Sequence, residues 1–215
     1  MRRVEFLSED KKLVGVFHPM KGEKKEGPCV ITCHGLDSYK DSEKYIEIAK
    51  RFSNDFSVFR FDFRGCGESE GDKIKDLSNR IEDLRTAINL IKNQPSVDAN
   101  RIGLFGSSMG GYLSILIAAE EEVKAIVTWS APYRLPMEDL KSDARDVIQD
   151  IRCPIMIIHG DKDEFVPVSH ARELYDRADE PKELKIIDGA DHRFMDLSLR
   201  DKAIDISLEW FKKYL

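Results

Sequence analysis

The sequence predicts an α/β fold with a mostly parallel central sheet and helices on both of its faces. Two observations lead to this prediction, namely the pattern of an N-terminal hairpin and the alternation of segments that follows it. Behind an N-terminal hairpin, short apolar runs rich in valine and isoleucine alternate with longer amphipathic segments. Because parallel strands are joined by crossovers that pack on the sheet, such an alternation favours helices on both faces. Ligands bind such sheets at the carboxyl ends of the strands, so the loops that follow the strands should hold the chemistry.

The elements follow in order along the chain. Residues 4–19 predict an antiparallel edge hairpin with its turn at Glu9–Lys12. Short apolar runs predict the buried strands, which are 29–35, 57–65, 101–108, 123–132, 153–161 and 183–189. Helical spacing of apolar residues predicts the helices, which are 41–52, 77–91, 109–122, 169–181 and 201–215. The helix over 109–122 is apolar nearly all round, so it should be buried.

Composition excludes several classes of protein. The chain of 215 residues suits one domain, residues 1–215, and its net charge of −6 disfavours nucleic-acid binding. No run is long and apolar enough for a membrane span, and the N-terminus lacks the pattern of a signal peptide. The four cysteines form no CxxC pair, which favours reduced thiols and a cytoplasmic location. Metal-binding spacings are absent too, so we expect no metal and no other cofactor.

The loop after residues 101–105 carries a G-x-S-x-G motif with Ser108 at its centre. A serine at a tight strand-to-helix turn takes a strained backbone that exposes its hydroxyl. Glycine at positions 106 and 110 removes Cβ atoms that would collide with the neighbouring strand and helix. We therefore predict Ser108 as a nucleophile. The neighbouring Ser107 is a weaker candidate for the nucleophile, because it lacks glycines at both flanking positions. The alternative interpretation of the motif is a plain glycine-rich turn without a catalytic serine.

A serine nucleophile needs a base, and a carboxylate must orient that base. His192 is the only histidine after the last predicted strand. Carboxylates in the loop after residues 153–160 could orient it, and these are Asp161, Asp163 and Glu164. Asp163 leaves room for the loop to turn back towards His192, whereas Asp161 suits an Asx turn.

An oxyanion formed at Ser108 would need two N–H donors. The backbone N–H of Met109 begins a helix, whose positive dipole end faces the site. Leu36 follows His34 and Gly35 at the end of the strand 29–35, so its N–H is the second candidate. His34 itself is expected to hold this loop by hydrogen bonds.

Five segments, spread across nearly the whole chain, match the motifs of one protein family in the family's order. They are CHGLDSYKDSEKY, FDFRGCGESEG, GSSMGG, HGDKDEFVP and GADHRF. They are similar to the α/β-hydrolase family, in the serine esterase branch that includes feruloyl esterases and monoacylglycerol-lipase-like enzymes. The resemblance implies the α/β-hydrolase fold, a catalytic triad of Ser108, Asp163 and His192, and oxyanion donors at Leu36 and Met109. Many relatives carry a large helical cap, whereas this chain offers only a short insert around 131–151.

The residues and the resemblance together predict a serine hydrolase that cleaves carboxylic esters through an acyl-enzyme. A peptidase or thioesterase on the same scaffold is the alternative, and a binding protein without catalysis ranks last. Aromatic residues near the strand ends are candidates for lining the pocket, and they are Trp129, Tyr133, Phe165 and Phe194. The expected partner is a small-molecule ester, with neither nucleic acid nor a membrane span, and the edge hairpin or the insert could pair two copies in a homodimer.

Overall fold

A sheet of eight strands forms the centre of the computed structural model, which describes residues 1–22, 26–73, 78–135 and 143–215. The strands are β1 (Arg2–Ser8), β2 (Lys11–His18), β3 (Gly27–Cys33), β4 (Ser57–Phe61), β5 (Val97–Ser107), β6 (Ala125–Trp129), β7 (Ile155–Gly160) and β8 (Lys182–Ile187). Their order in the sheet is β1-β2-β4-β3-β5-β6-β7-β8. Among the strand pairs of the described residues, β1–β2 and β2–β4 are antiparallel and the others are parallel, so the predicted edge hairpin and mostly parallel sheet are confirmed.

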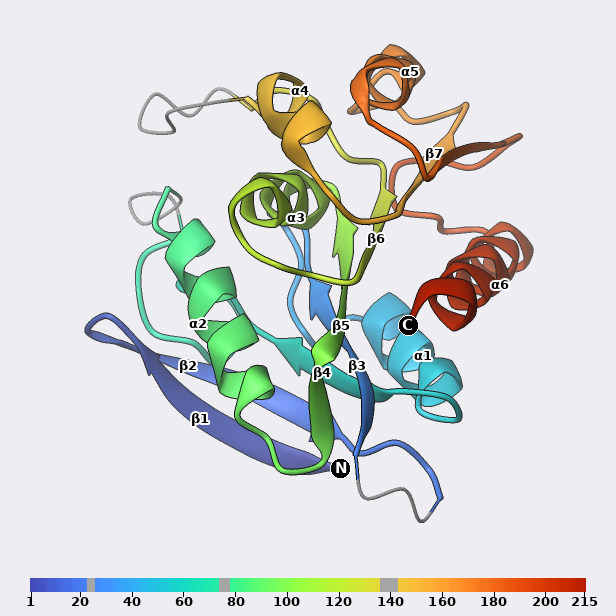
Figure 1. The fold of residues 1–215 in the computed structure, drawn as a ribbon. Coiled ribbons are helices and arrows are strands. Elements are labelled where there is room, and N and C mark those ends of the chain that lie inside the picture. The colour runs from blue at the N-terminus through green and yellow to red at the C-terminus, as the bar shows by residue number, and fades with distance from the viewer. Residues whose placement is uncertain (23–25, 74–77, 136–142) are drawn as a thin grey trace.

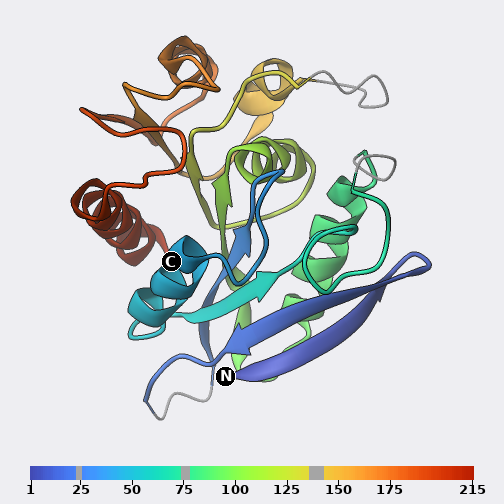
Figure 2. The same ribbon diagram turned by 180° about the vertical axis from the view of Figure 1, so that it is seen from behind.

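Helices cover both faces of the sheet (Figures 1 and 2). Within the described ranges they are α1 (Glu43–Phe52), α2 (Arg80–Lys92), α3 (Met109–Glu120), α4 (Ala144–Val147), α5 (Val168–Arg177) and α6 (Leu197–Tyr214), with a short 3₁₀ helix at Ile148–Asp150. Helices α1 and α6 pack on one face, and α2, α3, α4 and α5 pack on the other. Two hydrophobic cores therefore sandwich the sheet, one on each side.

Helix α3 shows how hydrophobicity alone fixes a position in the fold. Every residue from Met109 to Ala118 is buried, because α3 packs against β5 and β6 on one side and is enclosed by α2 and α4. The apolar sequence on all sides of this helix predicted that burial. The helix that carries the motif loop is thus held firmly at the centre of the sheet.

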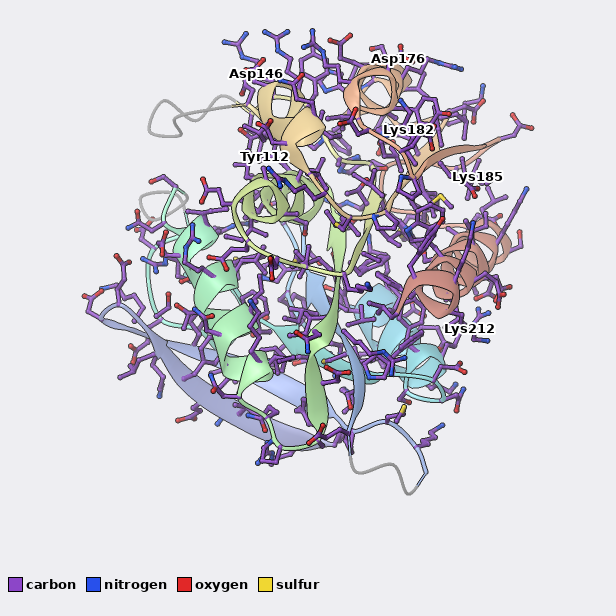
Figure 3. The ribbon with its side chains drawn as sticks, in the orientation of Figure 1. Tyr112, Asp146, Asp176, Lys182, Lys185 and Lys212 are labelled. Atoms are coloured by element: carbon purple, nitrogen blue, oxygen red, sulfur yellow. The ribbon has the colours of Figure 1, made fainter. Side chains whose placement is uncertain are left out.

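Several predicted boundaries shift by a few residues. Helix α6 begins at Leu197 rather than at 201, because the carboxylate of Asp196 accepts the N–H groups of Ser198 and Leu199 and caps the helix. Ser42 precedes α1 at the N-cap position, but its side chain makes no capping bond. Helix α5 ends at Arg177, and the ammonium of Lys182, a residue labelled in Figure 3, donates to the carbonyls of Tyr175 and Ala178 at this end of the helix.

The insert lies between β6 and β7. Its described part contains α4 and the 3₁₀ helix, and both pack beside α3 and α5. Residues 136–142 lie outside the described residues, and so does Leu77, the first residue of the helix predicted over 77–91.

The strand register brings four loops to one end of the sheet. Cys33 at the end of β3 pairs with Gly106 of β5, and Ser107 pairs with Trp129 at the end of β6. Gly160 at the end of β7 pairs with Ile187 at the end of β8. The loops after β3, β5, β7 and β8 thus meet at the carboxyl edge of the parallel sheet, where ligand sites form in such folds.

Candidate active site

Ser108 occupies a strained turn between β5 and α3. Its φ of 55° and ψ of −122° lie in a region that side chains rarely adopt, at a cost of about 1–3 kcal/mol. Two glycines make the turn feasible: a Cβ atom on Gly106 would lie 2.4 Å from the carbonyl oxygen of Gly110, and one on Gly110 would lie 2.1 Å from that of Cys33. The Ser108 N–H also donates to the carbonyl of Trp129 at 2.8 Å, which ties the turn to β6.

The imidazole of His192 lies between Ser108 and Asp163. Its Nε2 is 3.0 Å from Ser108 Oγ, and its Nδ1 is 2.8 Å from Asp163 Oδ2 and 2.9 Å from Oδ1. An ionised carboxylate only accepts, so Nδ1 must carry the proton. The lone pair of Nε2 then faces the serine, and Ser108 Oγ–H can donate to it.

The side chain of Asp163 is fully buried and receives several other donors. The backbone N–H groups of Phe165 and Val166 donate to Oδ1 at 3.0 and 2.8 Å, and His159 Nε2 lies 3.2 Å from Oδ2. Burial alone would raise the pKa of Asp163, but hydrogen bonds from His159, His192 and Val166 outweigh burial and hold the pKa well below its usual range. The carboxylate therefore stays ionised beside the imidazole.

His159 contributes to this environment, and the sequence analysis did not single it out. Its ring is buried on β7, and Nε2 donates to the carbonyl of Val166 at 2.8 Å while facing Asp163. The available signal was its position four residues before Asp163 in HGDKD. His159 thus fixes the loop that carries the carboxylate.

The other two candidate carboxylates join the loops that follow β7 and β8. Asp161 Oδ1 accepts the N–H of Gly189 at 2.6 Å, and Glu164 Oε2 accepts the backbone N–H of His192 at 3.2 Å. Both bonds connect the loop after β7 to the loop that carries His192. Asp163 is the carboxylate that meets the imidazole ring itself.

The loop after β3 brings Leu36 close to the nucleophile turn. Gly35 packs against Ser108 so closely that a Cβ atom on Gly35 would lie 3.3 Å from the Cβ of the serine. Leu36 and Ser108 both line a cavity at this end of the sheet. His34 holds this loop in place: its Nε2 accepts the N–H of Phe63 at 3.0 Å, so its Nδ1–H donates to the carbonyl of Gly35 at 2.7 Å. Burial lowers the pKa of His34 to about 3, which keeps the ring neutral.

Met109 is the first residue of α3, and it is nearly fully buried. The N–H groups in the first turn of a helix have no partners within the helix, and they carry its positive dipole end. Met109 follows Ser108 directly along the chain, so its N–H belongs to this first turn.

A cavity of about 370 Å³ opens beside Ser108 and His192. Phe165, at 64% exposed, lines its mouth with its ring 5.3 Å from that of His192. Trp129 and Phe194 were expected to line the pocket, but the structure places both in the core. Their rings pack together at 4.7 Å and are fully buried, because the Trp129 side chain points to the α6 face, where Nε1 donates to Ser207.

Tyr133 is also absent from the lining of this cavity. Its ring stacks on His170 at 3.9 Å, and its backbone N–H donates to His170 Nδ1 at 3.2 Å, so it fastens the insert to α5. Among the described residues, no cluster of histidine, cysteine, aspartate or glutamate side chains is arranged to hold a metal ion. No helix in the described ranges is long and apolar enough to cross a bilayer.

A parallel sheet with a serine on a strained strand-to-helix turn, backed by histidine and aspartate from later loops, defines a class of α/β proteins. Residues 26–210 match the family model described as an alpha/beta hydrolase domain. The chain therefore belongs to the alpha/beta hydrolase family.

Curated relatives extend beyond the matched region. The chain is 27% identical over 207 residues to "Uncharacterized protein YfhR" of Escherichia coli (strain K12), with 88% of this chain and 72% of that protein covered. It is 28% identical over 180 residues to alpha/beta hydrolase domain-containing protein 17B of Homo sapiens, with 78% of this chain and 61% of that protein covered.

Solved structures share the fold at low sequence identity. Est1E from Butyrivibrio proteoclasticus, solved with ferulic acid bound, superposes with a TM-score of 0.84 at 19% identity, covering 97% of this chain and 99% of that one. The alpha/beta hydrolase GrgF from Penicillium sp. sh18 has a TM-score of 0.84 at 22% identity, covering 99% and 98%.

Proposed function

We propose that this protein is a serine hydrolase that cleaves carboxylic esters through an acyl-enzyme intermediate. The observation that carries the proposal is the hydrogen-bonded series from Ser108 through His192 to Asp163. A serine hydroxyl is a weak nucleophile until a base removes its proton. His192 Nε2 has both the distance and the lone pair for that role.

The first half of the reaction acylates the serine. Ser108 Oγ attacks the carbonyl carbon of the ester while its proton passes to His192 Nε2. The N–H groups of Leu36 and Met109 bind the oxyanion, and the buried carboxylate of Asp163 stabilises the imidazolium. The carbon–oxygen bond to the alcohol then breaks, and the imidazolium returns the proton to the departing alkoxide.

The second half releases the acid. Water gives a proton to His192 Nε2 and attacks the acyl carbon. The bond between the acyl carbon and Ser108 Oγ then breaks, and the imidazolium returns the proton to Oγ as the free acid leaves. The N–H groups of Leu36 and Met109 serve again as oxyanion donors. A cavity of about 370 Å³ accommodates a small substrate. The four free thiols support a reducing compartment such as the cytoplasm.

A substrate panel tests this proposal. Purified wild-type protein and the Ser108→Ala variant are assayed on p-nitrophenyl esters, an acyl thioester and an aminoacyl anilide. Turnover of the esters by the wild type, with loss in the variant, supports the proposal. Preference for the thioester or the anilide would instead identify a thioesterase or a peptidase. Ester turnover that persists in Ser108→Ala would contradict the role of the serine.

A further inference from the structure

Lys44 stands at the wall of the cavity without a carboxylate partner. It lies in the first turn of α1, and its ammonium donates to Ser107 Oγ at 2.8 Å, one residue before the nucleophile. The same ammonium lies 5.3 Å from the centre of the Tyr45 ring and 5.6 Å from that of Trp129. In the part of the chain that the structure describes, no carboxylate oxygen comes within 4.0 Å of it. Two of its three protons thus lack an acceptor there.

The surroundings of Lys44 are unfavourable for a cation. Burial, followed by the positive charges of Arg200 on α6 and Arg193 after β8, lowers the pKa of Lys44 to about 7, whereas Asp191 acts in the opposite direction. An isolated ammonium in such a place is stabilised by any anion that reaches it. The cavity therefore favours a ligand that supplies negative charge.

The carboxylates that line the cavity already have cationic partners. Glu43 accepts from Arg200 at 3.1 Å, and Asp37 pairs with Lys73. Arg193 lines the cavity as well, and within the described ranges no carboxylate oxygen lies within 4.0 Å of its guanidinium nitrogens. Lys44 and Arg193 thus give this wall of the cavity positive charge that is not held in a direct ion pair, because Asp191 acts on Lys44, and Asp37 on Arg193, only from beyond 4.0 Å.

The geometry points to an ester substrate that carries a free carboxylate, which Lys44 binds while Ser108 attacks the ester carbonyl; this inference rests on the esterase function proposed above. Lys44 Nζ provides the direct contact, and Arg193 adds to the positive field. The apolar side chains of Leu36, Leu135 and Phe165 line other parts of the cavity and suit the hydrocarbon between the two carboxyl groups. The substrate class is thus a half-ester of a dicarboxylic acid, or an ester whose alcohol carries a carboxylate.

Matched substrate pairs test the inference and locate the carboxylate. On the acyl side, monomethyl adipate is compared with methyl hexanoate, in which a methyl group replaces the carboxylate. On the alcohol side, 3-carboxyphenyl acetate is compared with 3-methylphenyl acetate. For each pair, the ratio of kcat/KM for the anionic ester to that for the neutral ester is measured in wild type, Lys44→Met and Lys44→Arg. Lys50→Met serves as the matched control, since Lys50 lies on α1 with its side chain 73% exposed.

We expect the wild type to prefer the anionic member of at least one pair by about tenfold or more, the effect of one charged hydrogen bond. Lys44→Met should abolish this preference, Lys44→Arg should keep most of it, and Lys50→Met should not change it. The preference should also fall as the pH rises through about 7, because the Lys44 ammonium then loses its proton. The ratio cancels any pH dependence of the chemical step, because both esters of a pair undergo the same step.

The outcomes separate the two proposals. If the wild type hydrolyses the neutral esters as well as or better than the anionic ones, the inference fails and the esterase function stands. A preference that survives in Lys44→Met would also overturn it, because another group would then bind the anion. If no ester in either pair is hydrolysed, the esterase function fails and the inference fails with it.

Discussion

Replacing Asp163 with asparagine should disable the imidazole without disturbing the fold. The side-chain oxygen of asparagine can still accept the N–H groups of Phe165 and Val166, which now donate to Oδ1 at 3.0 and 2.8 Å. The new amide group then donates towards His192 Nδ1, which must become an acceptor. The ring proton moves to Nε2, and that nitrogen can no longer take the proton of Ser108.

The expected loss is large, because the wrong tautomer removes the base entirely. In triads of this kind the change from aspartate to asparagine lowers kcat about 10⁴-fold, which corresponds to about 5 kcal/mol of barrier. Initial rates on p-nitrophenyl acetate give kcat, and thermal unfolding shows that the variant is folded.

Asp161→Asn is the matched control in the same loop. Its side chain keeps the oxygen that accepts the N–H of Gly189 at 2.6 Å, so kcat should stay within a few-fold of wild type. If Asp163→Asn is folded and retains more than about a tenth of wild-type activity, or if Asp161→Asn shows the larger loss, the assignment of the carboxylate is wrong.

Three further predictions concern the turn and the carboxylate. Ser108→Gly should abolish turnover yet stabilise the protein by about 1 kcal/mol or more in urea unfolding, because glycine relieves the strain at φ 55°; lower stability would contradict this reasoning. Gly110→Ala should cost about 3 kcal/mol or more in the same assay, since its Cβ would meet the Cys33 carbonyl at 2.1 Å; a neutral effect would show that the turn can relax. The lowered pKa of Asp163 contributes stability that is present above its unfolded pKa of about 3.9 and is lost as the pH falls through the folded pKa. Wild type should therefore lose stability in acid more steeply than Asp163→Asn. Parallel curves of unfolding free energy against pH for the two proteins would refute this.

Much of the fold could be predicted because local patterns and tertiary packing agree. The helix after Ser108 is apolar on nearly all sides, so it had to be buried against the centre of the sheet, and it lies there as α3. The alternation of strands and helices likewise determined where the loops meet. The order of Ser108, Asp163 and His192 along the chain placed each at the carboxyl end of a strand, so bringing them together required only the predicted topology.

The lining of the cavity could not be predicted in the same way. Trp129 ends a strand that is buried on both faces, so no alternation of polar and apolar residues shows which way its side chain points. It turns towards α6 and Ser207, away from the cavity. The sequence analysis also missed Lys44. It is one lysine on a charged helix, and nothing in the sequence indicates that its ammonium reaches the end of β5.

A single labelling experiment tests the central claim most directly. The wild-type protein is treated with a fluorophosphonate probe, digested, and mapped by mass spectrometry. The account predicts one adduct, on the Oγ of Ser108, that forms much more slowly in His192→Ala. An unlabelled wild-type protein, or a probe attached to another residue while Ser108 stays unmodified, would contradict it.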